Sequence, residues 1–258
     1  MTNRVLPMPH SRHLRLLLLS LGLCLLITPI SLAGADAPTV RTATSATTPV
    51  NRNPKRHEEF LARLATGPVG LLFLGDSITA MWPFTSPTWK KFEKHEVANF
   101  AVPGERTEDL LWRITNGELE GMAPQVVVIL IGTNNLAKKE EQPEWIAAGV
   151  KAILEVVQTK LPKAQIILMG LLPRAQPEDP LRARVKAVNE LLKTFAVPEK
   201  ITYLDIGEQL VDEHGEVKKF MPDLLHPNGK GFAVWDKALW PILSKLLESP
   251  ATPVAPAH

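Results

Sequence analysis

Cysteine is almost absent from this sequence, which has one such residue in 258, Cys24. It lies in an apolar run inside residues 1–35, a segment with the character of a secretory signal. Cleavage of this segment leaves a chain without cysteine, so disulfides, thiolate metal sites and a cysteine nucleophile are excluded together. Lipid attachment to Cys24 is not expected either, because Leu23 precedes it where a lipoprotein signal needs a small residue.

The chain also lacks an excess of charge of one sign. It has 29 Lys and Arg residues against 27 Asp and Glu. Three of the basic residues and none of the acidic ones lie in residues 1–35, so the remainder has 26 basic and 27 acidic residues. No Lys/Arg block is long enough to follow a phosphate backbone, and we expect no nucleic acid partner.

No apolar run is long enough for an ordinary membrane-spanning helix. The run from Leu16 to Ile30 is shorter than the roughly 20 residues that a span needs, and it contains Pro29. Basic residues precede it, and small-residue cleavage sites end at Ala33 and Ala35. We therefore predict a secreted or periplasmic protein with no stable membrane span after cleavage. The alternative is a signal retained as an anchor.

The composition beyond the signal divides the chain into three parts. Residues 36–54 are rich in Thr, Ala and Pro with almost no large apolar side chain, which predicts a flexible linker. Residues 249–258 have the same character and are predicted to form a disordered tail. The folded domain is then 55–248, and the overall 45% hydrophobic and 22% charged residues are typical of a globular protein.

Within the domain, short apolar runs alternate with longer helical patterns. Five runs have strand length and little period-2 alternation, as in strands buried on both faces: 69–74, 97–100, 126–131, 165–169 and 201–204. Four segments have apolar residues at three- and four-residue spacing: 107–116, 144–159, 181–195 and 230–247. This βαβ rhythm predicts an α/β fold with a parallel sheet covered by helices on both faces.

The loops after the first three predicted strands carry groups suited to acyl transfer. In the strand order 2-1-3-4-5, ligands bind beside strand 1, beyond the carboxyl ends of the strands. Those loops offer the hydroxyl of Ser77, the backbone N–H of Gly104 and the side-chain amide of Asn134, which are an attacking group and donors for an oxyanion. Each has a structural alternative, since Asp76 and Ser77 can cap a helix and the other two can belong to turns.

A base for the serine is found near the C-terminus. Asp223 and His226 are three residues apart, a spacing that predicts a single helical turn with both side chains on one side. The carboxylate can then accept from imidazole Nδ1 and leave Nε2 free to take a proton. Asp-x-x-His alone is a weak indication of a catalytic base. It gains support because it follows, in the same chain, the three loops that carry Ser77, Gly104 and Asn134.

Other motifs are missing. His57, His95 and His214 have no spaced second ligand and are interpreted as surface residues. No phosphate loop or dinucleotide fingerprint is present, and the lack of a Gly-x-Ser-x-Gly elbow argues against an ordinary α/β-hydrolase. The proposed chemistry needs no metal and no organic cofactor.

Four blocks of this chain, in this order, resemble the SGNH (GDSL) hydrolase superfamily. They are Gly75-Asp76-Ser77, Gly104, Gly132-Thr133-Asn134-Asn135 and Asp223-Leu224-Leu225-His226-Pro227. Three further blocks resemble more narrowly the catalytic subunits of the intracellular platelet-activating-factor acetylhydrolase: Leu111-Trp112-Arg113, Asn116-Gly117-Glu118-Leu119-Glu120 and Gly170-Leu171-Leu172-Pro173-Arg174. The similarity covers about residues 69–247.

The resemblance implies a three-layer α/β/α, flavodoxin-like fold with a five-stranded parallel sheet. It implies Ser77 as nucleophile, His226 as base and then acid, and Asp223 as the residue that orients the imidazole. It also implies an oxyanion hole made of the N–H groups of Ser77 and Gly104 and the side chain of Asn134.

The resemblance further implies that Ile78, Thr133 and Leu225 crowd the acyl pocket, which favours a small acyl group. The animal enzymes are cytosolic and act with a WD-repeat partner, so neither that partner nor their substrate carries over to a chain with an export signal. Exported relatives often remove acetyl groups from polysaccharides.

We therefore predict an exported serine esterase for acetyl esters of carbohydrates or small molecules. The alternatives are a lysophospholipase or thioesterase of the same fold and a non-catalytic carbohydrate-binding module. The sequence leaves a homodimer open.

Overall fold

The computed structural model describes residues 41–86 and 89–248. The predicted signal segment 1–35 and tail 249–258 lie outside the described residues, as do residues 36–40 of the predicted linker. Among the helices of the described part, none is long and apolar enough to cross a membrane.

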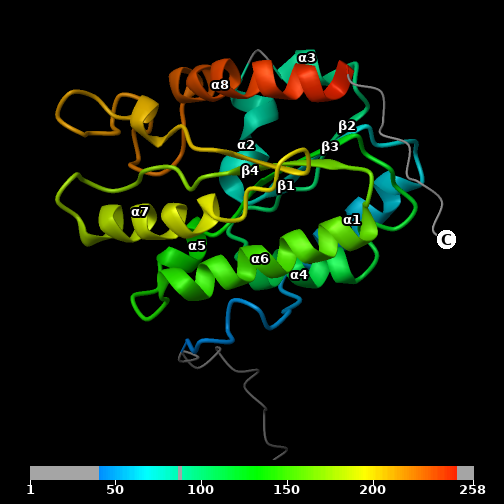
Figure 1. Cartoon of the computed structure of the whole chain (residues 1–258), viewed down its shortest axis with the longest axis horizontal. Coiled ribbons are helices and arrows are strands. Elements are labelled where there is room, and N and C mark those ends of the chain that lie inside the picture. The colour runs from blue at the N-terminus through cyan, green and yellow to red at the C-terminus, as the bar shows by residue number, and fades with distance from the viewer. Residues whose placement is uncertain (1–40, 87–88, 249–258) are drawn as a thin grey trace, which may run out of the picture. The chain divides into compact units, whose positions relative to one another are not determined.

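The centre of the domain is a five-stranded parallel sheet (Figure 1). Its strands are β1 (Leu71–Gly75), β2 (Val97–Asn99), β3 (Val126–Leu130), β4 (Gln165–Met169) and β5 (Ile201–Leu204), and their order is β2-β1-β3-β4-β5. Every residue of β1 and β3 is buried, as expected of strands covered on both faces. The predicted α/β fold and strand order are confirmed.

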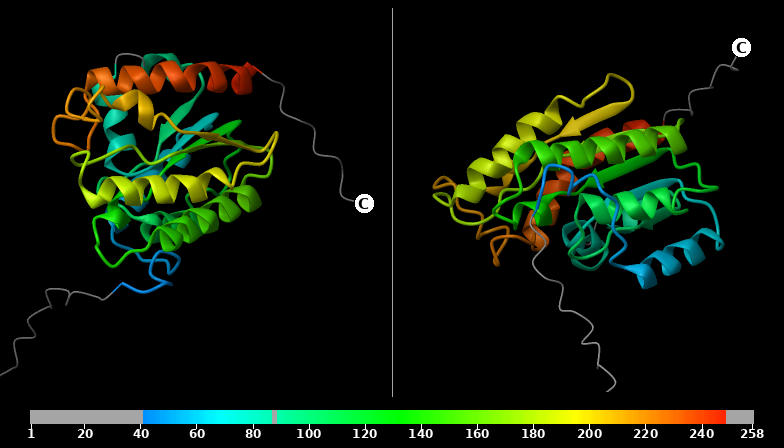
Figure 2. Two further views of the ribbon diagram at one scale, coloured as in Figure 1. Left: turned by 60° about the vertical axis from the view of Figure 1, so that its left-hand side comes forward. Right: turned by 90° about the horizontal axis from the view of Figure 1, so that it is seen from below.

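Helices cover both faces of the sheet (Figures 1 and 2). They are α1 (Pro54–Leu64), α2 (Ser77–Thr85), α3 (Lys90–Glu93), α4 (Thr107–Thr115), α5 (Thr133–Leu136), α6 (Pro143–Lys160), α7 (Pro180–Lys193) and α8 (Gly229–Glu248), with a 3-10 turn, η2, at Gly207–Leu210. In Figure 1, α3 and α8 lie above the sheet and α4, α6 and α7 lie below it. The four helices predicted from periodicity are confirmed to within about two residues at each end.

Aromatic packing fixes α2 to the sheet and to α8. Trp82 is fully buried, and its ring centroid lies 4.2 Å from that of Trp235 in α8 and 5.3 Å from that of Phe73 in β1. The Trp82 indole N–H also donates to Asp236 of α8 at 3.0 Å. The helix that begins at Ser77 is therefore held against two other elements.

The structure corrects the prediction of a flexible linker for residues 41–53, which we call the clasp. This segment runs along the layer of α4 and α6 (Figure 2, right). Ala46 is fully buried and its carbonyl accepts from the Thr107 hydroxyl at 2.9 Å, while Arg52 pairs with Asp109 at 2.7 Å. Polar contacts thus hold the clasp against the domain, although it has almost none of the large apolar side chains whose absence suggested disorder.

His57 was predicted at the surface, and this prediction is wrong. Its side chain is 10% exposed, and Nδ1 lies 3.0 Å from Glu118, which also pairs with Arg113. Arg113 in turn pairs with Glu105 at 2.8 Å and donates to the carbonyl of Phe100 at 2.9 Å. This buried network joins α1 and α4 to the segment that follows β2.

Candidate active site

The nucleophile candidate begins a helix directly after a buried strand. Ser77 is the first residue of α2, and Asp76 is its N-cap, whose Oδ1 accepts from the backbone N–H of Ile78 at 3.0 Å. The first N–H groups of a helix have no partner within the helix, and the N-terminus carries partial positive charge. Ser77 therefore sits where a developing negative charge is stabilised.

The structure brings Ser77, His226 and Asp223 together. Ser77 Oγ lies 2.9 Å from His226 Nε2, and His226 Nδ1 lies 2.6 Å from Asp223 Oδ2. The side chain of His226 is 26% exposed and that of Asp223 is 56% exposed. The arrangement can move a proton from the hydroxyl to the imidazole and stabilise the imidazolium that results.

Asp223 and His226 do not lie on a helical turn, contrary to the prediction from their spacing. The segment is a non-helical turn, in which Leu224 has a φ of 64°. Asp223 Oδ1 accepts from the N–H groups of Leu225 at 3.1 Å and His226 at 2.7 Å. One carboxylate thus closes its own turn through Oδ1 and contacts the imidazole through Oδ2.

Gly104 and Asn134 are brought next to each other. The Asn134 amide Nδ2 donates to the carbonyl of Glu105 at 2.8 Å, and Glu105 directly follows Gly104. Gly104 is exposed with a φ of +81°, in the left-handed region that favours glycine. Because an amide nitrogen has two hydrogens, one remains for a ligand while the other orients the side chain.

Two further residues hold the loop of Asn134, and the sequence assigned neither of them a role. Gly132 has a φ of +126°, and a Cβ there would lie 2.9 Å from Ile146. Arg174 is half-buried, and its Nη1 donates to the Thr133 carbonyl at 2.8 Å. Its only sequence signal was its place in a block shared with the acetylhydrolase subunits.

Asp76 is a buried carboxyl group beside the serine. Burial raises its pKa to about 7, opposed by the Ile78 hydrogen bond and then by the charges of His226 and Arg174. Its Oδ2 has no hydrogen-bond partner among the described residues. An ionised carboxylate with a free oxygen at full burial is unfavourable, so Asp76 is protonated below about pH 7.

The three residues expected to crowd the acyl pocket adjoin the site. Ile78 is 1% exposed, Thr133 is 2% exposed and Leu225 is partly buried. Each is the sequence neighbour of Ser77, Asn134 or His226. Elsewhere in the described ranges, no three His, Cys, Asp or Glu side chains are grouped so that they could hold a metal ion.

Comparisons with known proteins agree on one family. The model of the GDSL-like lipase/acylhydrolase family matches residues 73–234. The chain is 35% identical over 196 residues to platelet-activating factor acetylhydrolase IB subunit alpha2 of Homo sapiens, which covers 75% of this chain and 84% of the relative. It is 34% identical over 194 residues to subunit alpha1 of Bos taurus, covering 74% and 82%.

Solved structures show the same fold. A GDSL-like lipase from Bacteroides thetaiotaomicron is similar with a TM-score of 0.62 at 20% identity, covering 73% of this chain and 97% of that one. A carbohydrate esterase family 3 protein from Talaromyces cellulolyticus has a TM-score of 0.52 at 16% identity, covering 70% and 98%. With the family model and the relatives, these findings place the chain in the GDSL-like lipase/acylhydrolase family, as a carboxylic ester hydrolase.

Proposed function

We propose that this protein is an exported serine esterase that removes acetyl and other small acyl groups from carbohydrates or small-molecule alcohols. The observation that carries the proposal is the 2.9 Å contact between Ser77 Oγ and His226 Nε2, which joins residues 149 positions apart. A serine hydroxyl is a weak nucleophile until a base takes its proton, and this contact supplies the base.

The reaction has two halves. Ser77 Oγ attacks the ester carbonyl while His226 Nε2 takes its proton, and the alcohol leaves with that proton as the acyl–serine ester forms. Water then gives a proton to Nε2 and attacks the acyl group, and Ser77 regains the proton when acetate leaves. Asp223 keeps the imidazole in the tautomer with its proton on Nδ1 throughout.

The carbonyl oxygen becomes negatively charged in both halves. Its donors are the N–H of Ser77 at the start of α2, the N–H of Gly104 and the second amide hydrogen of Asn134. Donors fixed before the reaction stabilise this charge without reorganising, which is usually the largest contribution to such catalysis.

The size of the acyl group is limited by Ile78, Thr133 and Leu225. All three are side chains larger than alanine next to reacting groups, and two of them are almost fully buried. The names of the relatives, which are acetylhydrolases, support the same choice of acyl group. Export rests on the basic, apolar and small-residue pattern of residues 1–35.

Substitution of the reacting groups tests the proposal. Ser77→Ala and His226→Ala should each lower kcat by on the order of 10³-fold or more without unfolding the protein. His214→Ala is the matched control, because that imidazole is 78% exposed and bonded to no reacting group. Unchanged turnover in either active-site variant would refute the assignment.

Two further assays separate the rivals. Rates on p-nitrophenyl acetate, butyrate and octanoate should fall with acyl length, and a preference for octanoate would favour a lysophospholipase or thioesterase. A fluorophosphonate probe should label Ser77. Absence of labelling together with measurable glycan binding would favour the carbohydrate-binding module.

A further inference from the structure

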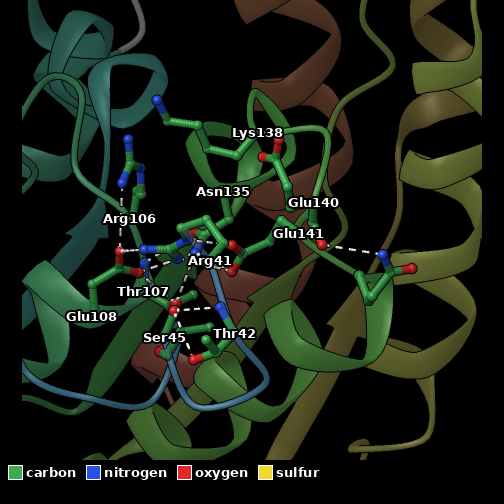
Figure 3. A network of polar contacts seen from close by, with 12 residues as sticks. Arg41, Thr42, Ser45, Arg106, Thr107, Glu108, Asn135, Lys138, Glu140 and Glu141 are labelled. Atoms are coloured by element: carbon green, nitrogen blue, oxygen red, sulfur yellow. Dashed lines mark hydrogen bonds and ion pairs between the residues drawn. The ribbon is translucent and has the colours of Figure 1, made fainter. Parts of the chain in front are cut away.

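The clasp brings one cation to two fully buried carboxylates. Arg41 Nη1 contacts Glu108 at 2.6 Å and Nη2 donates to Glu141 at 2.9 Å (Figure 3). The Arg41 side chain is 7% exposed and both carboxylates are at 0%. These partners lie 67 and 100 positions away in the chain, on α4 and on the segment before α6.

The two carboxylates depend on Arg41 to different degrees. Glu108 also lies 3.5 Å from Arg52 and 3.7 Å from Arg106, whereas Glu141 has Arg41 as its one ion-pair partner among residues 41–86 and 89–248. Burial pushes the pKa of Glu108 upward, but hydrogen bonds from Arg41, the backbone and Asn135, together with the charge of Arg41, leave that pKa below its ordinary value. Glu108 is therefore held ionised in the interior, and Glu141 shares the same guanidinium.

Asn135 connects these charges to the active site. Its Nδ2 donates to Glu108 at 3.1 Å and to Glu141 at 3.2 Å, and its Oδ1 accepts from the Thr107 N–H at 3.1 Å. Figure 3 shows Arg41 and Asn135 facing the same pair of carboxylates. Asn135 directly follows Asn134 in α5, a helix of only four residues.

Without Arg41, two buried like charges would compete for the amide hydrogens of Asn135. Opposite charge and hydrogen bonds are what make such burial tolerable, and an unpaired buried carboxylate moves toward water or takes a proton. Either response shifts Asn135. Because one turn of helix has no independent rigidity, Asn134 moves with it.

We propose that Arg41 is a positioning residue of the active site, which acts through Glu108, Glu141 and Asn135 to hold the Asn134 amide where the oxyanion forms. The inference rests on the proposed function of Ser77 and Asn134. It also limits N-terminal processing, because an active chain must retain Arg41. The small-residue cleavage sites ending at Ala33 and Ala35 satisfy this limit, and cleavage within the clasp does not.

The test is Arg41→Gln in the full chain. The fraction of reactive protein is first titrated to completion with a fluorophosphonate, so that kcat is expressed per reactive serine. A displaced oxyanion donor should lower kcat about 10- to 100-fold, with KM for p-nitrophenyl acetate changed less than about threefold. Arg56→Gln is the matched control, because Arg56 is 45% exposed and its contacts with Glu59 and the ring of Phe60 lie on its own helix.

A double-mutant cycle decides whether Arg41 acts through Asn134. Adding Arg41→Gln to Asn134→Ala should lower kcat by less than about twofold, because the donor to be positioned is already gone. If Arg41→Gln lowers kcat as much in the Asn134→Ala background as it does alone, the inference is overturned. Unchanged kcat per reactive serine in Arg41→Gln alone would also overturn it. Should Arg41→Gln not fold, Arg41→Lys undergoes the same cycle, since an ammonium keeps the charge but lacks the planar fork that contacts Glu141 through both Nε and Nη2.

The two proposals fail in distinguishable ways. If the unmodified protein reacts with the probe and hydrolyses the acetate, the proposed function stands whatever Arg41→Gln does. If the unmodified protein fails to react, the proposed function falls and this inference falls with it.

Discussion

Asparagine at position 223 should trap the imidazole in the wrong tautomer. Asp223 Oδ1 accepts from two backbone N–H groups, at 3.1 and 2.7 Å, while Oδ2 faces His226 Nδ1 at 2.6 Å. An asparagine side chain has only one oxygen, and the backbone N–H groups of Leu225 and His226 both donate to it. Its NH₂ group then faces Nδ1, which must accept, so the ring proton moves to Nε2. With that proton, Nε2 can no longer take the proton of Ser77.

The size of the effect follows from two contributions. Turning the amide over to restore the correct tautomer sacrifices two hydrogen bonds of about 1 kcal/mol each, so the active form is about 2 kcal/mol uphill. Loss of the carboxylate charge beside the imidazolium adds roughly 1 to 4 kcal/mol, toward the lower end because Asp223 is 56% exposed and screened by water. Together these predict a decrease in kcat of about 10²- to 10⁴-fold.

Steady-state hydrolysis of p-nitrophenyl acetate per folded protein measures this loss. Asp212→Asn is a matched control, because Asp212 Oδ1 also accepts from two backbone N–H groups, those of His214 and Glu216, in an exposed turn. Within the described part of the chain, no imidazole nitrogen is hydrogen-bonded to this carboxylate. That variant should keep kcat within about twofold. An Asp223→Asn kcat within about tenfold of the unmodified enzyme would refute the tautomer reasoning.

Two further predictions concern stability. Asp76→Asn keeps an acceptor for Ile78 and removes a carboxyl group whose pKa is about 7 in the fold against 3.8 unfolded. The native state keeps this proton to a higher pH than the unfolded state does, so the unmodified protein loses stability as the pH rises from 3.8 to about 7. The free energy of unfolding of Asp76→Asn should therefore rise relative to that of the unmodified protein by up to about 4 kcal/mol between about pH 4 and pH 8. Urea unfolding at both pH values measures this gain, and a difference that does not change with pH would contradict it. Arg113→Met removes the guanidinium that the buried Glu105 and Glu118 share, leaves them, among the described residues, only the contacts with Asn53 and His57, and should cost about 3–5 kcal/mol in urea unfolding. A cost below about 1 kcal/mol would show that the buried network is not held by that cation.

The local patterns of the sequence were sufficient to predict the sheet and its main helices. The run Val126–Leu130 is apolar at every position because both faces of β3 are covered, and such burial leaves a signature in adjacent residues. The residues of the candidate site were predictable for a related reason. Parallel strands end at one edge of the sheet, so the segments that follow them meet there, and Ser77 and Asn134 lie in the first turns of α2 and α5, directly after β1 and β3.

Interactions between distant residues left no such signature. The clasp is poor in large apolar side chains and therefore looked disordered, although Arg41 meets carboxylates 67 and 100 positions away. His57 looked like a surface residue for the same reason, since its partner Glu118 is 61 positions away. A charged residue is predicted to be exposed when no partner lies near it in the sequence. A partner that is distant in the sequence can nevertheless make its burial tolerable in the folded protein.

Sequence alone determined where the strands and the helices between them lie along the chain, because burial and periodicity act on neighbouring residues, and it showed the four short blocks that carry the chemistry. Tertiary structure alone decided that Asp223 reaches His226 through a turn with a positive φ at Leu224, that Asp76 is buried with a raised pKa, and that the clasp covers α4 and α6. These features depend on desolvation and on charges that meet only after the chain has folded.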